Sequence, residues 1–169
     1  LLLRQAMDKV AFLPFGLMVD RYRWQLFDGT IPADQLNKGW NDLRLEYQGI
    51  VPPVERDESG FDAGAKYHIP GNVPYTRYFL ARILQFQFFK AACDQAGWEG
   101  PLHRCSFYGN EEVGKNLAAM LEMGASKPWP DALEAFTGER QMSGTAMVEY
   151  FAPLKAWLDE QNAGQTEGW

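Results

Sequence analysis

A helix introduced by a proline is the feature of this sequence that most restricts its fold. From Tyr75 to about Ala96, residues recur at intervals of three and four, the spacing that places side chains on one face of an α-helix. Pro74 stands immediately before them, where its fixed φ and missing N–H suit the first residue of a helix. The recurring residues are Tyr75, Tyr78, Phe79, Arg82, Ile83, Phe86 and Phe89.

Two further helices are expected nearer the N-terminus. Residues 1–27 carry apolar side chains without strand-like alternation, which predicts a helix interrupted at Pro14. A second helix should begin near Pro32 and end before Gly49. Residues 51–72 are rich in proline, glycine and charge and have no helical stripe, so we expect a long irregular loop there.

The rest of the chain also favours helices. The predicted ranges are 111–123, 130–136 and 144–161, each followed by glycine, polar or helix-breaking residues. Strand signals are weak and occur near residues 65–69, and residues 162–169 are expected to fray. The expected class is therefore mainly α.

The composition fits a folded acidic domain. A chain of 169 residues with 46% hydrophobic content can fill one core. The net charge of −6 argues against nucleic acid as a partner, because phosphate binding relies on Lys and Arg. No apolar run approaches the roughly 20 residues that span a bilayer, so no membrane segment is expected. The opening Leu1-Leu2-Leu3-Arg4 looks like the middle of a helix, which suggests a fragment of a longer chain.

Two cysteines, Cys93 and Cys105, flank a turn-forming segment at residues 95–101. They can form a disulfide, or they can be two buried thiols, and the spacing alone leaves both open. A disulfide closing a loop of this size would contribute about 3 kcal/mol and would indicate an oxidising compartment.

The sequence contains no recognisable set of metal ligands. Histidine occurs only at positions 68 and 103, and there is no His-Glu-x-x-His motif or cysteine pair at zinc-finger spacing. A glycine-rich phosphate loop and a Gly-x-Ser-x-Gly turn are also missing. Glu111-Glu112 fits the start of a helix, where negative charge is favourable. No metal ligand is therefore assigned within this chain.

Residues 66–78 gather polar groups around a turn. Tyr75 and Tyr78 would share a helix face, and Lys66 and His68, two apart on an extended segment, would point the same way. With Arg77 nearby, such a set of donors suits a carboxylate or a developing oxyanion. The alternative is a histidine that caps the helix and tyrosines that belong to the core.

Several stretches of the sequence resemble the angiotensin-converting enzyme family of zinc metallopeptidases. They are FDAGAKYHIP at 61–70, PYTRYF at 74–79 and LQFQF at 84–88. The likeness extends to DKVAFLPFG at 8–16, RLEYQGI at 44–50 and GPLH at 100–103, and it weakens after about residue 130.

This resemblance implies a mostly helical, two-lobed fold around a deep substrate groove. In the family, a zinc-bound water attacks a peptide bond two residues from the substrate's C-terminus, and the zinc motif lies upstream of the matched region. The chain is therefore expected to be the C-terminal portion of a peptidyl-dipeptidase, inactive without its N-terminal portion. Zn²⁺ would be held by ligands outside the chain. An inactive peptide-binding relative is the alternative.

The resemblance also implies roles for single residues. His68 matches a histidine that bonds the substrate backbone and donates a proton to the leaving group, and Tyr78 matches the tyrosine that stabilises the oxyanion. Lys66 and Tyr75 match the pair that binds the substrate's terminal carboxylate. The expected substrates are thus oligopeptides with a free C-terminal carboxylate, cut to release dipeptides.

Three positions match residues of chloride sites in the family. Arg77 resembles the arginine of one site, and Trp40 and Arg44 resemble part of a second. Chloride is therefore a possible second ion, with some of its ligands outside this chain.

One substrate pocket departs from the family pattern. Asp8, Lys9 and Phe12 match residues of its wall, but Arg82 stands where vertebrate relatives have phenylalanine. A cation there would disfavour basic terminal residues of the substrate and could favour acidic ones.

The family cysteines that match Cys93 and Cys105 are bridged, so the resemblance implies a disulfide. The sequence also lacks an N-glycosylation site. Together these features favour a bacterial source and a periplasmic or secreted location.

Overall fold

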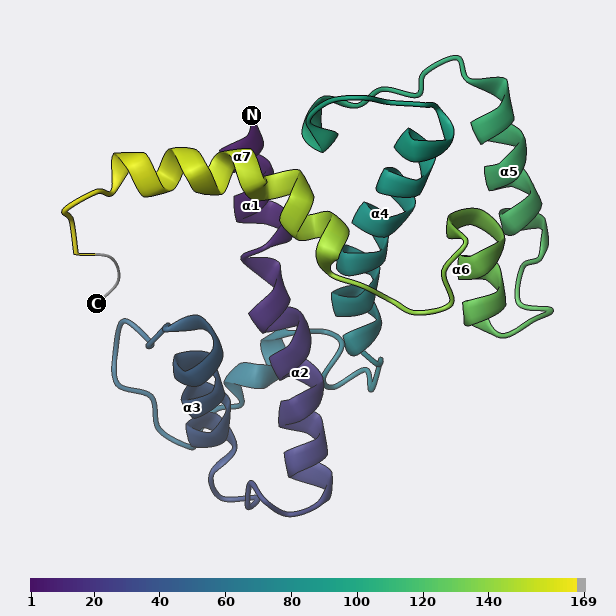
Figure 1. Cartoon of the computed structure of the whole chain (residues 1–169). Helices are drawn as coiled ribbons and strands as arrows, with labels where there is room; N and C mark the ends of the chain where they lie inside the picture. The colour runs from purple at the N-terminus through teal and green to yellow at the C-terminus, as the bar shows by residue number, and fades with distance from the viewer. Residues whose placement is uncertain (167–169) are drawn as a thin grey trace. The chain divides into compact units, whose positions relative to one another are not determined.

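The computed structural model describes residues 1–166 of the 169-residue chain (Figure 1). Within those residues all regular structure is helical, and no strand is present. The chain divides into two compact units. We call Gln5–Ala81 the N-terminal unit, and Leu1–Arg4 together with the residues from Arg82 onward the C-terminal unit. The predicted mainly α class is confirmed.

The interrupted helix expected for residues 1–27 is present as α1 (Leu2–Lys9) and α2 (Phe12–Phe27). The interruption lies upstream of Pro14, because a proline cannot donate to the carbonyl of Val10 and its ring crowds that carbonyl. The N–H of Leu13 donates to this carbonyl instead, at 3.0 Å. Pro14 thus sits within the first turn of α2, where its missing N–H costs little.

Helix α3 (Leu36–Gln48) begins later than expected because its cap comes from a distant residue. The carboxylate of Glu58 accepts from the backbone N–H groups of Asn37 and Lys38, each at 2.8 Å. The end of the helix agrees with the prediction: Gly49 follows it with a φ of 64°, which glycine adopts without strain.

The loop that follows α3 is irregular, as predicted, but it is anchored. Asn37 is 1% exposed, and its side-chain N–H₂ donates to the carbonyls of Asp57 and Gly60. Its oxygen accepts from the backbone N–H of Asp62, the first residue of the 3-10 helix η1 (Asp62–Ala65), at 2.7 Å. The buried side-chain amide of Asn37 therefore holds residues 57–62 of the loop against α3.

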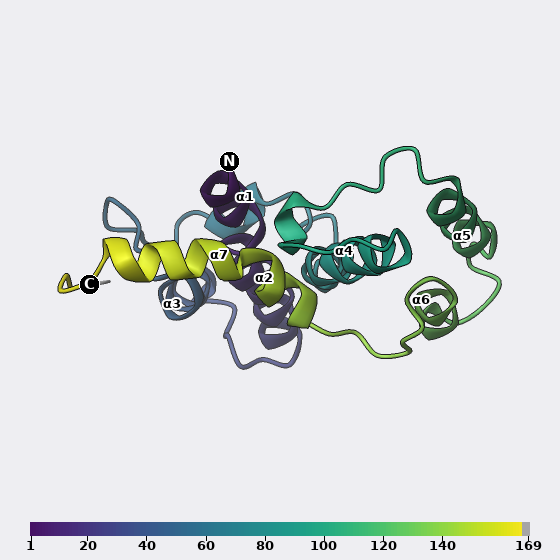
Figure 2. The same ribbon diagram turned by 45° about the horizontal axis from the view of Figure 1, so that its top comes forward.

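The core of the N-terminal unit lies between α2, α3 and η1, and α2 runs beside α3 (Figures 1 and 2). The phenol of Tyr22 donates to the carbonyl of Leu36 at 3.0 Å, which satisfies the one polar group of this fully buried side chain. Tyr75, from the candidate site, is part of the same core. Its buried members are Met18, Val19, Tyr22, Ile31, Trp40, Leu43, Ala63, Ile69 and Tyr75.

The long predicted helix is α4 (Thr76–Gln95), which begins in the N-terminal unit and continues into the C-terminal one. Pro74 is not its first residue, so that expectation was wrong by two positions. The N–H groups of Tyr75 and Thr76 are capped by a side chain from α2, described below, and this cap sets where the helix begins.

The C-terminal unit contains the helices predicted for the remainder of the chain, within two residues at each end. They are α5 (Glu111–Glu122), α6 (Trp129–Thr137) and α7 (Thr145–Gln161), with a 3-10 helix η2 (Leu102–Arg104) after α4. Helices α5 and α6 lie side by side in both views (Figures 1 and 2).

A disulfide joins Cys93, near the end of α4, to Cys105, just after η2. The bridge implied by the family resemblance is therefore present, and the alternative of two buried thiols was wrong. Aromatic rings pack against one another in the same unit: Phe86 lies 5.0 Å from Tyr150 and 5.4 Å from Phe151, between ring centres.

The C-terminus follows the expectation only in part. Beyond α7, the N–H of Asn162 still donates to the carbonyl of Leu158 at 2.9 Å. Residues 167–169, which belong to the tail expected to fray, lie outside the described residues. Within the described residues, no helix has the length and apolar character needed to cross a membrane.

Candidate functional site

Four of the predicted site residues come together at the start of α4. We call Lys66, His68, Tyr75 and Tyr78 the site cluster. The ammonium nitrogen of Lys66 lies 4.8 Å from the centre of the Tyr75 ring. The rings of Tyr75 and Tyr78 are 4.9 Å apart, and the His68 ring lies 4.8 Å from Tyr75 and 5.4 Å from Tyr78. Tyr75 is thus at the centre of the site cluster.

His68 and Tyr78 form the polar contact of the site cluster. Nε2 of His68 lies 3.3 Å from the phenol oxygen of Tyr78, and either atom can donate, depending on the tautomer. Nδ1 of His68 is buried and has no hydrogen-bond partner among the described residues. Tyr78 is 40% exposed, so its hydroxyl can also reach a bound molecule.

The environment of His68 favours a neutral imidazole. Desolvation lowers the pKa of His68 below its usual 6.5, the positive charges of Lys66 and Arg23 lower it further, and Asp20 opposes them. At neutral pH the ring therefore carries one proton. It can give a hydrogen bond through one nitrogen without adding charge beside Lys66.

Lys66 supplies positive charge on an aromatic surface. Its ammonium lies over the rings of Tyr75 and Phe15, at 4.8 and 5.4 Å from their centres, in cation–π geometry. The ring of Tyr75 is 5% exposed, so this side of Lys66 is held by packing. An ammonium held in this way beside phenols suits a carboxylate ligand.

The segment that carries Lys66 and His68 forms turns and not a strand, although the backbone of Lys66 itself is extended, so the strand signal at residues 65–69 was wrong. The chain turns there repeatedly: the N–H of Ile69 donates to the carbonyl of Lys66, and that of Val73 to the carbonyl of His68, at 2.8 and 2.9 Å. Asn72 has a φ of 49°, in the left-handed region that asparagine tolerates. The two side chains meet the tyrosines because the chain reverses direction, not because they alternate on a strand.

Sequence reasoning missed the buried carboxylate that caps α4. Asp20, on α2, is 3% exposed, and its Oδ2 accepts from the N–H of Tyr75 at 2.8 Å and from the N–H and hydroxyl of Thr76 at 2.7 and 2.8 Å. Its Oδ1 accepts from Arg23 at 2.6 Å. Burial acts to raise the pKa of Asp20, but the hydrogen bonds from Thr76, Tyr75 and Arg23 outweigh it, and the pKa lies below 3.8.

Arg23 connects this carboxylate to the turn that precedes α4. It is 5% exposed, and its Nη1 donates to the side-chain oxygen of Asn72 at 3.2 Å and to the carbonyl of His68 at 3.4 Å. An opposite-charge pair at positions 20 and 23, one turn apart on α2, was the available signal in the sequence. Its partners, some 50 residues away in the chain, could not be read from it.

Phenylalanines complete the surroundings of Tyr75. The ring of Phe12, predicted from the family pattern, lies 6.0 Å from the Tyr75 ring, and that of Phe15, which was not predicted, lies 5.7 Å away. Asp8 and Lys9 pair with each other at 2.8 Å at the end of α1, and Arg82 lies on α4 in the C-terminal unit. The roles of Asp8, Lys9 and Arg82 in a pocket wall remain predictions.

The three predicted chloride residues lie on two helices. Trp40 and Arg44 are one turn apart on α3, and Trp40 is buried against the rings of Tyr22 and Phe15. Nε of Arg44 is buried without a hydrogen-bond partner among the described residues. Arg77 is exposed in the first turn of α4.

The described part of the chain contains no set of side chains that could form a metal centre. Among residues 1–166, no group of three or more His, Cys, Asp or Glu side chains is arranged to hold a metal ion. The described residues thus do not fit a zinc ion by themselves.

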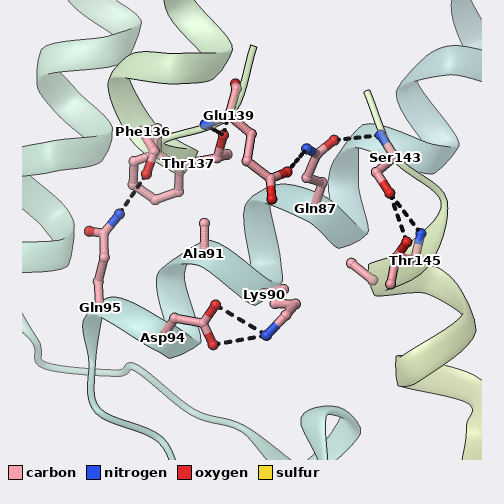
Figure 3. Close-up of a pocket in the computed structure, with 11 residues that line it drawn as sticks. Gln87, Lys90, Ala91, Asp94, Gln95, Phe136, Thr137, Glu139, Ser143 and Thr145 are labelled. Carbon is pink, nitrogen blue, oxygen red and sulfur yellow. Dashed lines mark hydrogen bonds and ion pairs between the residues drawn. The ribbon is translucent and has the colours of Figure 1, made fainter. Parts of the chain in front are cut away.

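A cavity of about 280 Å³ lies in the C-terminal unit (Figure 3). Its polar groups are already paired: Gln87 donates to Glu139 at 2.6 Å, and Lys90 pairs with Asp94 at 3.1 Å. None of the predicted site residues lines it. The lining residues include Gln87, Lys90, Ala91, Asp94, Gln95, Phe136, Thr137, Glu139, Ser143, Thr145 and Ala146.

The sequence is similar to known proteins over its whole length. The model of the M2 peptidase family, described as angiotensin-converting enzyme, matches residues 1–169. Angiotensin-converting enzyme of Mesocricetus auratus is 50% identical over 99% of this chain and 13% of the relative, and that of Bos taurus is 47% identical with the same coverage. That of Haematobia irritans exigua is 52% identical over 91% of this chain and 26% of the relative.

This chain therefore belongs to the angiotensin-converting enzyme family. It spans between 13% and 26% of the length of these curated relatives.

Proposed function

We propose that this chain is the part of a zinc peptidyl-dipeptidase that binds the substrate's C-terminus and stabilises the transition state. The observation that carries the proposal is the site cluster: an imidazole and a phenol 3.3 Å apart, beside an ammonium packed on Tyr75. Donors for a carboxylate and donors for an oxyanion thus share one small surface. Dipeptides would be released from oligopeptides that have a free C-terminal carboxylate.

Lys66 and Tyr75 would bind the terminal carboxylate of the substrate. The charge of Lys66 attracts the carboxylate, and contact with Tyr75 restricts where the ammonium lies. A carboxylate fixed at this point sets the distance along the peptide to the bond that is cut. In this way binding at the terminus defines a two-residue product.

Tyr78 and His68 would act on the bond that is cut. The phenol of Tyr78 can donate to the oxygen on which negative charge develops, and this donor contributes more in the transition state than in the ground state. His68, neutral near pH 7, can donate to the substrate backbone through Nε2. Its protonated form, populated at lower pH, can pass a proton to the leaving amine.

Zinc would be held by residues of the whole protein that lie outside this chain, and when bound it would supply an activated water. The chain alone is therefore proposed to be inactive. Chloride is proposed to bind near Arg44 with Trp40, and near Arg77. The unpaired Nε of Arg44 supports the first of these two sites.

The disulfide supports a location outside a reducing cytosol, in the periplasm or secreted. Zinc content and peptide cleavage of the full-length protein distinguish the peptidase from an inactive peptide-binding relative, which would bind oligopeptides without cutting them.

The test of the proposal is Tyr78→Phe in the full-length, zinc-loaded protein. We expect kcat to fall by a factor of about 10² to 10³, the effect of removing one oxyanion donor, with unchanged zinc content. Tyr108→Phe is the matched control, because Tyr108 is 99% exposed in the C-terminal unit. Equal turnover of the Tyr78→Phe variant and the control would exclude the assigned role.

Carboxylate recognition has a test of its own. Lys66→Ala should raise KM for free-acid peptides much more than for the same peptides with a C-terminal amide, because only the free acid offers a charge to bind. The control is Lys115→Ala, since Lys115 is an exposed lysine of α5. Equal changes in KM for both kinds of substrate would show that Lys66 does not bind the carboxylate.

A further inference from the structure

The buried ion pair of Asp20 and Arg23 lies between the two segments that carry the site cluster. His68 and Lys66 belong to the turn before α4, whereas Tyr78 belongs to α4 itself, and Tyr75 immediately precedes it. Both members of the pair come from α2, and their side chains are 4% and 7% exposed.

Asp20 determines where the first turn of α4 lies. Three hydrogen bonds from Tyr75 and Thr76 end on a single carboxylate oxygen, at 2.7 to 2.8 Å. A buried carboxylate at a helix N-terminus is a strong cap, because it satisfies free N–H groups and also opposes the positive end of the helix dipole. The N–H of Tyr78 donates to the carbonyl of Tyr75 at 2.9 Å, so the position of this first turn also determines the position of Tyr78.

Arg23 determines where the preceding turn lies. One arm of its guanidinium binds Asp20 at 2.6 Å, and the other reaches the side chain of Asn72 and the carbonyl of His68. A continuous path of hydrogen bonds therefore runs from the His68 carbonyl through Arg23 and Asp20 to the N–H of Tyr75. The path joins the backbone that carries the imidazole to the backbone that carries the phenol.

A cap made only for stability would not need this pair. Burying two charges removes their hydration, a cost that their attraction must offset, and apolar residues often replace such pairs without loss of stability. A local Ser, Thr or Asp before the helix would cap it at no such cost. The buried pair, in contrast, fixes the distance between the turn that carries His68 and the first turn of α4, which a local cap cannot do.

We propose that Asp20 and Arg23 are a positioning pair that sets the separation of His68 from Tyr78, and through it the rate of the catalytic step. This inference rests on the proposed function of the site cluster. Neither residue of the pair needs to touch substrate. Their effect on the rate is expected to be large, since a displacement of about 1 Å in an active site can cost about 10²-fold in rate.

The decisive variant is Arg23→Lys in the full-length, zinc-loaded protein. Lysine keeps a charge that can reach Asp20 but lacks the second arm of the guanidinium, which holds the turn of His68. We expect kcat to fall by about 10- to 100-fold while KM for free-acid peptides changes less than about threefold. Asn72→Gly removes the side-chain oxygen that accepts from Arg23, and glycine tolerates the positive φ at this position. It should therefore also lower kcat, but by a smaller factor.

The matched control is Asp42→Asn, which breaks the exposed ion pair of Lys38 and Asp42 on α3 in the same unit. It should leave kcat and KM unchanged. If Arg23→Lys fails to fold, Asn72→Gly decides the question, because Asn72 is exposed and its change leaves the ion pair in place. The proposal is overturned if kcat of the folded variants stays within twofold of the unaltered protein.

The outcome also separates this proposal from the proposed function. Loss of turnover in Tyr78→Phe together with unaltered kcat in Arg23→Lys and Asn72→Gly would reject the positioning pair and keep the peptidase assignment. Unaltered turnover in Tyr78→Phe would reject the role of Tyr78 on which this inference rests, whereas a full-length, zinc-loaded protein that binds oligopeptides without cutting them would reject the peptidase assignment itself.

Discussion

Helices α4 and α5 start in different ways. In the N-terminal unit, α4 is capped by Asp20, a residue of another helix that lies 55 positions from Tyr75. In the C-terminal unit, α5 is capped by the residue just before it: the side chain of Asn110 accepts from the N–H groups of Glu112 and Val113, each at 3.1 Å. A local cap stabilises its own helix, whereas a remote one also fixes that helix relative to another segment.

The two units also differ in the buried groups that link distant parts of the chain. The N-terminal unit contains a buried ion pair and a buried amide: Asp20, Arg23 and Asn37 are each at most 5% exposed and each hydrogen-bonded to distant residues. The C-terminal unit contains a disulfide between Cys93 and Cys105 and one buried amide, Gln87, which donates to Glu139 at 2.6 Å. Among the described residues, the buried charges thus lie in the unit that carries the site cluster.

The largest effect should follow from removing the remote cap. Asp20→Ala leaves Arg23 buried without its partner and frees the N–H groups of Tyr75 and Thr76, so the free energy of unfolding of the N-terminal unit should fall by about 3 to 5 kcal/mol. Denaturant unfolding of the full-length protein measures this. Asp42→Asn serves as the exposed control, with an expected loss of about 0.2 to 1 kcal/mol. Equal losses would show that the buried ion pair contributes no more to the free energy of unfolding than the exposed one.

The corresponding change in the C-terminal unit is removal of the disulfide. In the Cys93→Ser, Cys105→Ser double variant, the free energy of unfolding should fall by about 3 kcal/mol, the loop-closure value for a cross-link between residues 12 apart. The chain offers a simple measurement: the reduced unaltered protein and the double variant should unfold at the same denaturant concentration. Comparison by hydrogen exchange should place the loss in the C-terminal unit, and a loss confined to residues 5–81 would contradict the comparison.

Acid should affect the two units differently. A carboxyl whose folded pKa is lowered contributes stability at pH values above its unfolded pKa, and that contribution is lost as the pH falls through the folded pKa. For Asp20 this window lies below 3.8. The lowered pKa of His68 acts in the same direction, with stability fully present above 6.5 and lost as the pH falls. Five groups of the N-terminal unit have lowered pKa values: Asp20, Asp28, Asp57, Asp62 and His68.

We therefore expect hydrogen-exchange protection, measured relative to the intrinsic exchange rate at each pH, to fall in residues 5–81 before it falls in the C-terminal unit when the pH is lowered from 7 to about 3. In the C-terminal unit the pKa of Lys90 is raised by its hydrogen bond to Asp94, and the stability linked to a raised lysine pKa is lost as the pH rises through it. Asp20→Asn should reduce the difference between the units. Simultaneous opening of both units in acid would contradict this expectation.

The two helix starts also explain which parts of the structure could be predicted from the sequence. The beginning of α5 was correctly predicted at Glu111, because its signals are neighbours in the chain. The beginnings of α3 and α4 were displaced, because Glu58 and Asp20 cap them from afar. Periodicity predicts that a helix exists, but a cap from a distant residue decides where it starts.

The site shows the same division. The family pattern pointed to Lys66, His68, Tyr75 and Tyr78, and the structure brings these four together, yet the extended geometry proposed for Lys66 and His68 was wrong. Asp20 and Arg23 were missed because a charged residue on a helix is expected at the surface until its partners are known. Contacts made across 45 to 56 residues leave no local signal.

The smallest expected effect belongs to the local cap. Asn110→Ala should lower the free energy of unfolding of the C-terminal unit by about 1 kcal/mol, because two N–H groups of α5 lose their acceptor. Asn110→Asp keeps an acceptor and adds charge at the positive end of the helix, so it should restore the stability or raise it slightly.

Both Asn110 variants should leave peptide turnover unchanged, whereas a change at Asp20 should alter it. Kinetics of the full-length protein alongside denaturant unfolding would measure the two effects on the same samples. If Asn110→Ala lowered kcat as much as Asp20→Asn, both caps would affect turnover only through the stability of the protein. The remote cap would then have no role in turnover that the local cap lacks.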